Sequence, residues 1–413
     1  MLSIDFIREN PELVAEKAKQ KGIEVNIKRL LERDESRRSL LAQIDELRSK
    51  RNELTAQNKG QKPSDEVIEK GRKLREELEA IEVTLQETAT SYQEELEKIP
   101  NVFPEDTPLG GEDANKPIKH VGEANKKEVK DHLTWGETKG YLDFERGAKV
   151  AGAKFYYTKG PLVELELACI QLAMSIALKH GFTPITVPHM VNEKTANGTG
   201  FSPKGEEDQI YTIEGEDLSL IATAEIPITG YHAGEILEAK DLPLLYVGLS
   251  PAYRKEAGAY GKHSKGLFRV HQFNKVEMYV FCKPEESPKW HDKLVEIEEE
   301  LCASLEIPYQ MVRIAAGDLG APAYKKFDIE YWSPVGGTYR ELMSCSNVTD
   351  YQARRLKIRY RNEEGKPELV HTLNGTAMAF SRIAIALIEN HQDKSGDVVI
   401  PKALQPYISK DKI

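Results

Sequence analysis

Residues 253–277 read YRKEAGAYGKHSKGLFRVHQFNKVE, and charged and aromatic residues stand at both ends of this stretch. The pattern predicts long strands over residues 244–249 and 268–281 that flank a Gly-rich loop. Side chains alternate along a strand, so the second strand would present five residues on one face: Arg269, His271, Phe273, Lys275 and Glu277. On the first strand, Arg254 and Glu256 would also share a face.

This predicted face has the chemistry of a nucleotide site and is a poor hydrophobic core. Arginines suit phosphate groups, a phenyl ring suits a purine, and a carboxylate can accept a proton from an amino group. A solvated face with scattered ion pairs is the alternative, and these residues alone leave it open.

The surrounding sequence from residue 105 to 413 predicts an α+β domain. A strongly apolar helix is expected over 162–180, then a short strand that holds Val187 and Pro188, and a closing helix over 375–391. Strands joined by hairpins, with the helices segregated from them, indicate an antiparallel β-sheet flanked by helices.

The N-terminal region, residues 1–104, predicts an antiparallel helical hairpin. Asn10 and Pro11 read as the N-cap and first residue of a short helix. Apolar residues then recur every three or four positions over 30–54 and again over 67–92, with the turn GQKPS at 60–64 between them. This coiled-coil arm would cover about residues 28–98, with helices of about 40–50 Å. Prolines and glycines at 104–111 mark a linker to the second domain.

Basic residues gather at the far end of the predicted arm. The chain has a net charge of −10, which argues against a general attraction to nucleic acid. Four acids lie between positions 48 and 75, against nine basic residues: Arg48, Lys50, Arg51, Lys59, Lys62, Lys70, Arg72, Lys73 and Arg75. A basic tip on a stiff stalk suits phosphate contacts, although a dimerising or scaffolding coiled coil is the alternative for such a segment.

Composition narrows the class of protein. The chain has 413 residues, 40% hydrophobic and 30% charged, and its four cysteines form no CxxC pair, which favours buried thiols over a zinc site. We expect no apolar stretch approaching the roughly 18–20 residues that span a bilayer, no membrane association and a cytoplasmic location. Walker A, GxGxxG, nucleophile-elbow and HExxH motifs do not occur in the sequence.

Five further motifs bring a family into view: TAE at 223–225, HQFNKVE at 271–277, YRELMSCSN at 339–347, QARR at 352–355 and HTLNGT at 371–376. With them the chain resembles the bacterial-type seryl-tRNA synthetases, which are class II aminoacyl-tRNA synthetases, along essentially its whole length. The hairpin that contains Arg254 and Phe273 resembles motif 2 of that class, and residues 374–382 resemble motif 3. Val187 and Pro188 resemble motif 1, the dimer-forming element.

The resemblance implies a role for each matching position. Serine would be bound by Thr223, Ala224, Glu225, Glu277 and Thr376. ATP would be bound by Arg254, Lys255, Glu256, Arg269, Phe273, Glu341, Leu342, Met343, Ser344 and Arg382. Among these, Arg254, Arg269 and Arg382 would be catalytic, and Glu341 and Ser344 would hold Mg²⁺. Since Glu341 and Ser344 are three positions apart, they can share a face of a strand only if a bulge or strand end lies between them.

The implied activity is a serine–tRNA ligase that works as a homodimer. It would activate L-serine with ATP to seryl-adenylate and transfer the seryl group to the 3′-terminal ribose of tRNA(Ser); whether tRNA(Sec) is also a substrate is left open. Three other functions are possible for such a sequence: a relative that loads a carrier protein, a non-catalytic RNA-binding homologue, and a coiled-coil scaffold. The long arm argues against the first, and Arg254, Glu277 and Arg382 argue against the other two.

Overall fold

The computed structural model describes residues 1–58, 64–124, 128–201, 209–256 and 266–413, and the chain forms two units, Met1–Val102 and Phe103–Ile413. The first unit is helical. Its helices are α1 (Ile4–Glu9), α2 (Pro11–Gln20), α3 (Ile27–Gln57) and α4 (Asp65–Glu97). Pro11 is the first residue of α2, as its fixed φ and missing N–H favour, and Ser64 caps α4 by accepting from the Val67 amide. Helix α1, which precedes α2, was not expected from the sequence.

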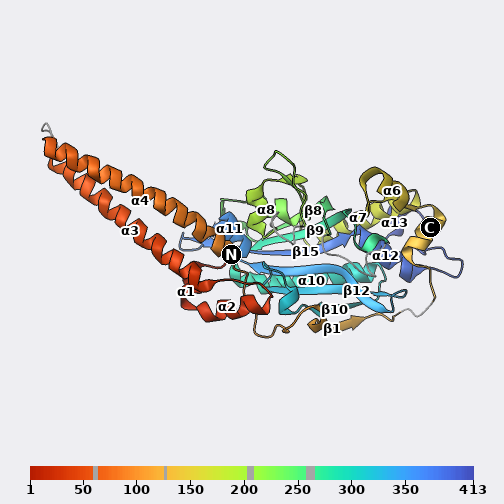
Figure 1. Cartoon of the computed structure of the whole chain (residues 1–413). Helices are drawn as coiled ribbons and strands as arrows, with labels where there is room; N and C mark the ends of the chain where they lie inside the picture. The colour runs from red at the N-terminus through yellow and green to blue at the C-terminus, as the bar shows by residue number, and fades with distance from the viewer. Residues whose placement is uncertain (59–63, 125–127, 202–208, 257–265) are drawn as a thin grey trace. The chain divides into compact units, whose positions relative to one another are not determined.

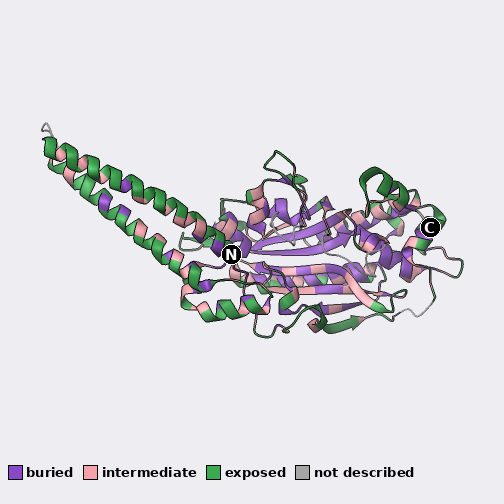
Figure 2. Ribbon diagram, in the orientation of Figure 1, coloured by how far each residue is buried: buried purple, intermediate pink, exposed green. Residues whose placement is uncertain are grey.

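Helices α3 and α4 confirm the predicted antiparallel hairpin (Figure 1). They contain 31 and 33 residues, so each is about 47–50 Å long at 1.5 Å per residue. Ile44, Leu47 and Leu78 form a thin buried seam between them, and most other side chains of the pair are exposed (Figure 2). A seam this narrow is typical of a two-helix coiled coil.

The basic residues at the far end of the arm are exposed, and most of them form ion pairs. Arg48 pairs with Glu82 at 3.0 Å, Lys50 with Glu46 at 2.6 Å, and Arg75 with Glu79 at 2.8 Å. Lys70, Arg72 and Lys73 pair with glutamates one helical turn away. Because several of these partners lie outside positions 48–75, the tip is less positive than a count over that window indicates. Lys59 and Lys62 lie outside the described residues.

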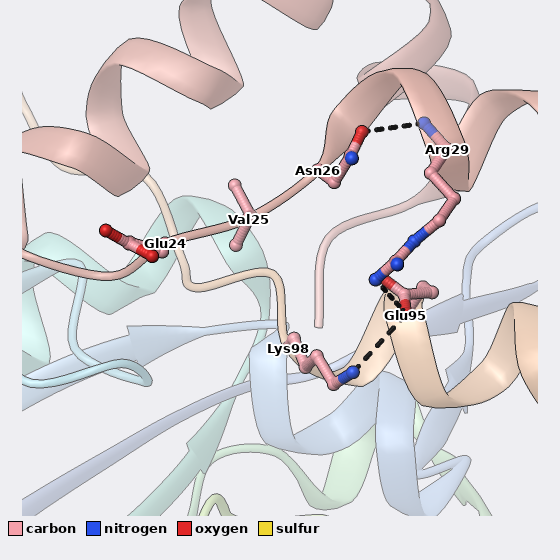
Figure 3. A pocket seen from close by; sticks show the side chains of 6 residues that line it. All are labelled: Glu24, Val25, Asn26, Arg29, Glu95 and Lys98. Atoms are coloured by element: carbon pink, nitrogen blue, oxygen red, sulfur yellow. Dashed lines mark hydrogen bonds and ion pairs between the residues drawn. The ribbon is translucent and has the colours of Figure 1, made fainter.

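The base of the arm is fastened by a charged cluster beside a cavity of about 300 Å³ (Figure 3). Arg29 near the start of α3 pairs with Glu95 near the end of α4 at 2.6 Å, and Lys98 adds a second cation at 3.3 Å. Asn26 caps α3 by accepting from the Arg29 amide. The Arg29 hydrogen bond lowers the pKa of the Glu95 carboxyl, so this link between the two helix ends is charged at neutral pH.

The second unit is built on a mostly antiparallel sheet that, in the described residues, has eight strands (Figure 1). Their spatial order is β1 (Lys116–Val121), β10 (Tyr309–Arg313), β11 (Lys325–Ser333), β12 (Thr338–Thr349), β15 (His371–Ala379), β9 (Gln272–Cys282), β8 (Leu244–Tyr253) and β4 (Thr183–Thr186). Only the β4–β8 pair in this sheet is parallel. Smaller sheets are formed by β14 (Pro367–Leu369), β13 (Arg359–Arg361) and β7 (Ile236–Glu238), by β2 (Leu142–Asp143) with β3 (Tyr157–Thr158), and by β5 (Met190–Val191) with β6 (Ser219–Leu220).

Helices cover both faces of this sheet. They are α5 (His132–Lys139), α6 (Phe144–Ala151), α7 (Pro161–Lys179), α8 (Glu193–Thr199), α9 (Glu225–Tyr231), α10 (Ser287–Ser304), α11 (Tyr351–Leu356), α12 (Phe380–His391) and α13 (Gln405–Ile408). Along β9, Val276, Met278 and Val280 join the core formed with α7, α10 and α12. Tyr279 and Phe281 join the core formed with α9 and α11. The period of two therefore sends Lys275 and Glu277 to the α9 side. This arrangement confirms the predicted α+β class.

Four predicted element boundaries were wrong. Strand β8 ends at Tyr253, beyond the predicted end at 249. Strand β9 begins at Gln272, not at 268, because Gly266–Phe268 form a 3₁₀ turn that buries Leu267 and binds its amide to His132. Gly266 has φ +69°, and a Cβ there would lie 2.1 Å from the His132 ring, so only glycine fits. The closing helix begins at Phe380, since 375–379 pair in the sheet as the end of β15. Val187 and Pro188 follow β4 and are not part of it.

Helix α7 corrects the expectation about apolar stretches. Among the described residues it is the one helix whose 19 residues are long and apolar enough to cross a membrane by length and composition alone. Its side chains Leu162, Leu165 and Cys169 are buried in the core against the sheet. A core helix of a protein can have the same composition, and the buried face of α7 accounts for part of its apolar residues.

Candidate active site

Glu277 lies at the centre of a buried polar cluster on the α9 side of the sheet. Its side chain is fully buried, and one carboxylate oxygen pairs with Lys275 Nζ at 2.6 Å. Asn374 Nδ2 donates to the other oxygen, Oε1, at 3.1 Å, and the Thr376 hydroxyl donates to the oxygen that pairs with Lys275, Oε2, at 3.4 Å. Thr376 is the cross-strand partner of Glu277 in the β15–β9 register, which explains why two residues far apart in sequence meet.

Thr223 and Glu225 come from the start of α9 and join the same cluster. Lys275 Nζ donates to the Thr223 hydroxyl at 3.3 Å, and Gln352 Nε2 donates to a Glu225 oxygen at 2.7 Å. Burial, with the neighbouring Glu277 carboxylate, raises the pKa of Glu225 to about 7. Ala224 between them is fully buried. The structure thus brings together all five residues predicted to bind serine.

Arg254 and Phe273 lie side by side next to this cluster. The guanidinium is 5.3 Å from the centre of the Phe273 ring, and its Nε donates to the Ala222 carbonyl at 3.4 Å. Burial, together with the nearby Arg382, lowers the pKa of Arg254, although it remains a cation. The half-buried arginine and the half-buried Phe273 ring present a cation and a stacking surface in one place.

In the hairpin that resembles motif 2, the residues directly after β8 and directly before β9 do not form regular strand. Arg254 and Glu256 lie beyond the end of β8, and Glu256 has φ +48°, a conformation that L side chains rarely adopt. Its carboxylate pairs with Arg269 at 3.3 Å. His271 and Arg269 both precede β9, so they are not on the strand face that was predicted for them, and His271 Nδ1 lies 2.8 Å from the Arg254 carbonyl oxygen. Residues 257–265 of the predicted loop lie outside the described residues.

Strand β12 contains the predicted bulge. In the β11–β12 register Ile329 pairs with Met343 and Glu330 with Glu341, so Leu342 is the additional residue. Leu342 and Met343 both bury their side chains in the core, and only their backbone groups can face a ligand. Glu341 and Ser344 are left half-buried on the other side.

Arg382, at the start of α12, pairs with Glu341 at 2.7 Å and lies 5.1 Å from the Phe268 ring. Burial alone would raise the pKa of Glu341, but Arg382 and Lys326 lower it, so the carboxylate is charged. The described residues contain no cluster of three or more His, Cys, Asp or Glu side chains that could hold a metal ion. Glu341 and Ser344 nevertheless offer the hard oxygen ligands that Mg²⁺ prefers when phosphates supply the rest.

Three polar residues of this site were missed in the assignment of site residues from sequence. Lys275 neutralises Glu277, Asn374 donates to it, and Gln352 donates to Glu225. Lys275 could have been found from its position two residues before Glu277 on one strand. Gln352 belongs to the QARR motif at 352–355, but the motif does not show which residue it contacts, because α11 meets the site only through the tertiary fold. Lys255 lies beside the site, where its amide donates to the Gln209 carbonyl.

Comparison with known families accounts for both units. Residues 1–103 match the seryl-tRNA synthetase N-terminal domain, and residues 210–391 match the class II tRNA synthetase core domain for G, H, P, S and T. The serine–tRNA ligase of Rubrobacter xylanophilus is 44% identical over all of this chain and 99% of its own length. That of Treponema denticola is also 44% identical, over the full length of both.

Solved structures agree with these relatives. The seryl-tRNA synthetase of Pyrococcus horikoshii, complexed with ATP, superposes with a TM-score of 0.92 at 42% identity, covering 100% of this chain and 99% of that one. The cytoplasmic serine–tRNA ligase of Naegleria fowleri, in complex with AMP, gives 0.87 at 32% identity, with 100% and 98% coverage. Full-length identity and a shared fold lead to one conclusion: the chain belongs to the seryl-tRNA synthetase family of class II aminoacyl-tRNA synthetases.

Proposed function

We propose that this chain is a serine–tRNA ligase, which activates L-serine with ATP and transfers the seryl group to the 3′-terminal ribose of tRNA(Ser). The observation that carries the proposal is the buried cluster in which Glu277, Thr376, Thr223 and Glu225 converge beside Arg254. It combines polar groups sized for a small hydroxy amino acid with a cation suited to phosphate.

In the serine site, Glu225 would be the counter-charge of the substrate ammonium group, with Thr223 and Ala224 beside it. Glu277 and Thr376 would meet the amino and hydroxyl groups. Such a site would reject alanine, because its buried polar groups would be left without partners. It would reject threonine if the cavity has no room for another methyl group.

In the ATP site, Arg254 would bind the α-phosphate, Phe273 would stack on adenine, and Glu256 would accept from the adenine amino group. Arg269 and Arg382 would neutralise the outer phosphates, with Lys255 and the backbone of Leu342 and Met343 nearby. Glu341 and Ser344 would hold Mg²⁺, which when bound stabilises negative charge on the phosphates. The ion pairs Arg382–Glu341 and Arg269–Glu256 support these roles, since they keep each cation positioned before a phosphate arrives.

The proposed chemistry needs no general acid or base from the protein. The serine carboxylate attacks the α-phosphorus of ATP and expels pyrophosphate, giving seryl-adenylate. The 3′-terminal ribose hydroxyl of tRNA then attacks the seryl carbonyl and releases AMP. The main barrier to the first step is the approach of two anions, which Arg254, Arg269 and Arg382 would lower by neutralising charge.

The two units suggest separate roles in tRNA binding and catalysis. Residues 1–104 would form the tRNA-binding domain, whose arm would contact the tRNA body through its basic tip, and residues 105–413 would form the catalytic domain. We further propose a homodimer located in the cytoplasm. The family membership of both units supports the tRNA role, and the exposed Arg48, Lys50, Arg51 and Arg75 supply cations for phosphate contacts.

Serine-dependent exchange of pyrophosphate into ATP tests the first step, and aminoacylation of purified tRNA(Ser) tests the second. Exchange should require serine and remain at background with alanine or threonine. Equal exchange with alanine would contradict the proposed serine site, and exchange without aminoacylation would favour an acceptor other than tRNA.

Deletion of the hairpin between about Leu40 and Leu85 tests the arm. The shortened protein should still make seryl-adenylate, because every proposed active-site residue follows position 220. Transfer to tRNA should fall sharply, and the salt dependence of tRNA binding should become shallower as phosphate contacts are lost. Equal tRNA affinity with and without the arm would refute this role. Heterodimers of an arm-deleted subunit and an Arg254→Ala subunit would then reveal whether the arm serves its own active site or its partner's.

A further inference from the structure

Gln352, in helix α11, is a fully buried residue to which the proposed chemistry assigns no task. Its side chain is nevertheless fixed by four hydrogen bonds. The hydroxyl groups of Tyr279 and Thr372 donate to Oε1 at 2.7 Å and 2.8 Å. Nε2 donates to the Thr199 carbonyl at 3.1 Å and to Glu225 Oε1 at 2.7 Å.

These partners determine which way the amide points. A carbonyl oxygen can only accept, so the end of the amide nearest Thr199 must be the NH₂ group. Both hydrogens of that group are then used, and both acceptor positions of Oε1 are filled by hydroxyl groups. The Tyr279 oxygen is itself held by the Thr229 hydroxyl at 2.6 Å. Gln352 is therefore saturated and cannot turn without breaking several buried hydrogen bonds.

Glu225 depends on this donor. In the described residues, Gln352 is the only side chain that donates a hydrogen bond to its carboxylate. The charged groups that face Glu225 are Lys275 and Glu277 of β9 and Arg254 after β8. Tyr279 of β9 also faces it. The groups contributed by α8, α11 and β15 are neutral: the Thr199 carbonyl, the Gln352 amide and the Thr372 hydroxyl. Burial and Glu277 favour the protonated acid, whereas Gln352, Lys275 and Arg254 favour the carboxylate.

We propose that Gln352 is a positioning residue for serine activation, which holds one oxygen of Glu225 so that the other is presented to the ammonium group of the amino acid. This inference rests on the proposed function. The saturated amide fixes the orientation of the carboxylate before serine arrives, and its hydrogen bond favours the charged form of Glu225 against the effect of burial. The serine site is thereby coupled to α8, α11 and β15, none of which contributes Glu225 itself.

Replacement of Gln352 by Met, which has similar length and no amide, tests the proposal. The serine KM in pyrophosphate exchange should rise about tenfold or more, as expected for loss of a hydrogen bond to a charged group, while the ATP KM stays within about twofold. Glu225 acts as its carboxylate, so exchange should fall as pH drops through about 7 in the wild-type enzyme. In Gln352→Met this acid limb should lie at higher pH, because a group that favours the charged form has been removed.

Two milder variants keep the test valid if Gln352→Met fails to fold. Tyr279→Phe and Thr372→Val each remove one hydroxyl that holds Oε1 and leave the bond to Glu225 in place. Each should raise the serine KM by a smaller factor, with the ATP KM unchanged. Gln392→Met is the matched control, since Gln392 is also buried and makes three hydrogen bonds, all to backbone groups of Lys130 and Ile388.

The outcomes separate this inference from the proposed function. If wild-type protein shows no serine-dependent exchange, the proposed function is wrong and the inference is wrong with it. If wild-type exchange is normal and the three variants have the same serine KM and the same loss of exchange at low pH as the wild type, only the inference is overturned. Equal losses in the serine and ATP KM values, or the same loss in Gln392→Met, would mean that Gln352 is merely structural.

Discussion

The buried Lys275–Glu277 pair allows the structural and chemical roles of one site to be separated. Glu277→Gln removes the negative charge while keeping the shape, and Lys275→Met removes the positive charge. Each single change leaves a buried charge without its partner, because Lys275 is only 6% exposed and Glu277 is fully buried. A broken buried pair costs about 3–5 kcal/mol of stability, so each single variant should unfold at a clearly lower urea concentration.

The double variant, Glu277→Gln with Lys275→Met, should recover most of this loss. Replacing both members of a buried pair is often close to neutral, so we expect stability within about 1–2 kcal/mol of wild type and a coupling of about 3 kcal/mol or more. Urea unfolding can be followed by tryptophan fluorescence, since all three tryptophans lie in the second unit, Phe103–Ile413, at positions 135, 290 and 332. The refolded double variant should bind ATP and yet show no serine-dependent exchange, because the proposed ligand of serine is gone.

Two results would refute this reasoning. If both single variants unfold within about 1 kcal/mol of wild type, the pair at 2.6 Å does not hold the strand in place. If the double variant is stable and still exchanges pyrophosphate with a normal serine KM, Glu277 is not a serine ligand. Lys293→Met, which breaks the exposed Lys293–Glu296 pair, is the control and should change stability by less than about 1 kcal/mol.

Further changes probe other parts of the molecule. Arg254→Lys should lower kcat for exchange roughly tenfold or more with little change in stability, because lysine lacks the planar two-pronged contact; near-normal turnover would argue against a phosphate role. Glu298→Met should stabilise the protein by about 1–3 kcal/mol in urea unfolding, since Glu298 is fully buried and no side chain in the described residues donates a hydrogen bond to its carboxyl. Burial raises the pKa of Glu298, so the folded state keeps a proton that the unfolded state releases above about pH 4. The stability gained by Glu298→Met should therefore be larger at pH 8 than at pH 5, and an equal gain at the two pH values would contradict this explanation. Arg8 and Arg37 outweigh the effect of burial and lower the pKa of Asp34, so the charged carboxylate stabilises the wild type at neutral pH and this stability is lost as pH falls. Asp34→Asn should therefore be less stable than wild type at neutral pH. Identical acid unfolding of the two proteins, followed by circular dichroism, would contradict this.

Local patterns were sufficient wherever one physical rule decided the outcome. The apolar spacing of residues 30–54 and 67–92 predicted α3 and α4, because an amphipathic helix needs only its own periodicity and a partner. Ser64 was a cap for the same local reason. The spacing of Glu341 and Ser344 required a bulge in β12, which the register of Leu342 confirms.

Predictions failed where a distant residue changed the local conformation. Strand β9 was expected to begin at 268, but a hydrogen bond from the Leu267 amide to His132, 135 residues away, closes a 3₁₀ turn instead. Residues 375–379 have a composition compatible with helix, yet pairing with β9 makes them strand. A Cβ on Gly375 would lie 3.3 Å from the Glu298 carboxyl on α10, so a larger residue there would require neighbouring side chains to shift by a few tenths of an ångström.

By itself, the sequence determined the helical arm, the α+β class, and the residue types of the proposed site, because periodicity and motif chemistry depend on neighbours along the chain. Only the tertiary structure decided the partners of those residues: Lys275 and Asn374 for Glu277, Gln352 for Glu225, and Arg382 for Glu341. The physical reason is that charge balance and hydrogen bonding in a buried site are set by distances between elements. Those distances follow from the register of the sheet and from the packing of α9, α11 and α12 against it, which no stretch of sequence specifies alone.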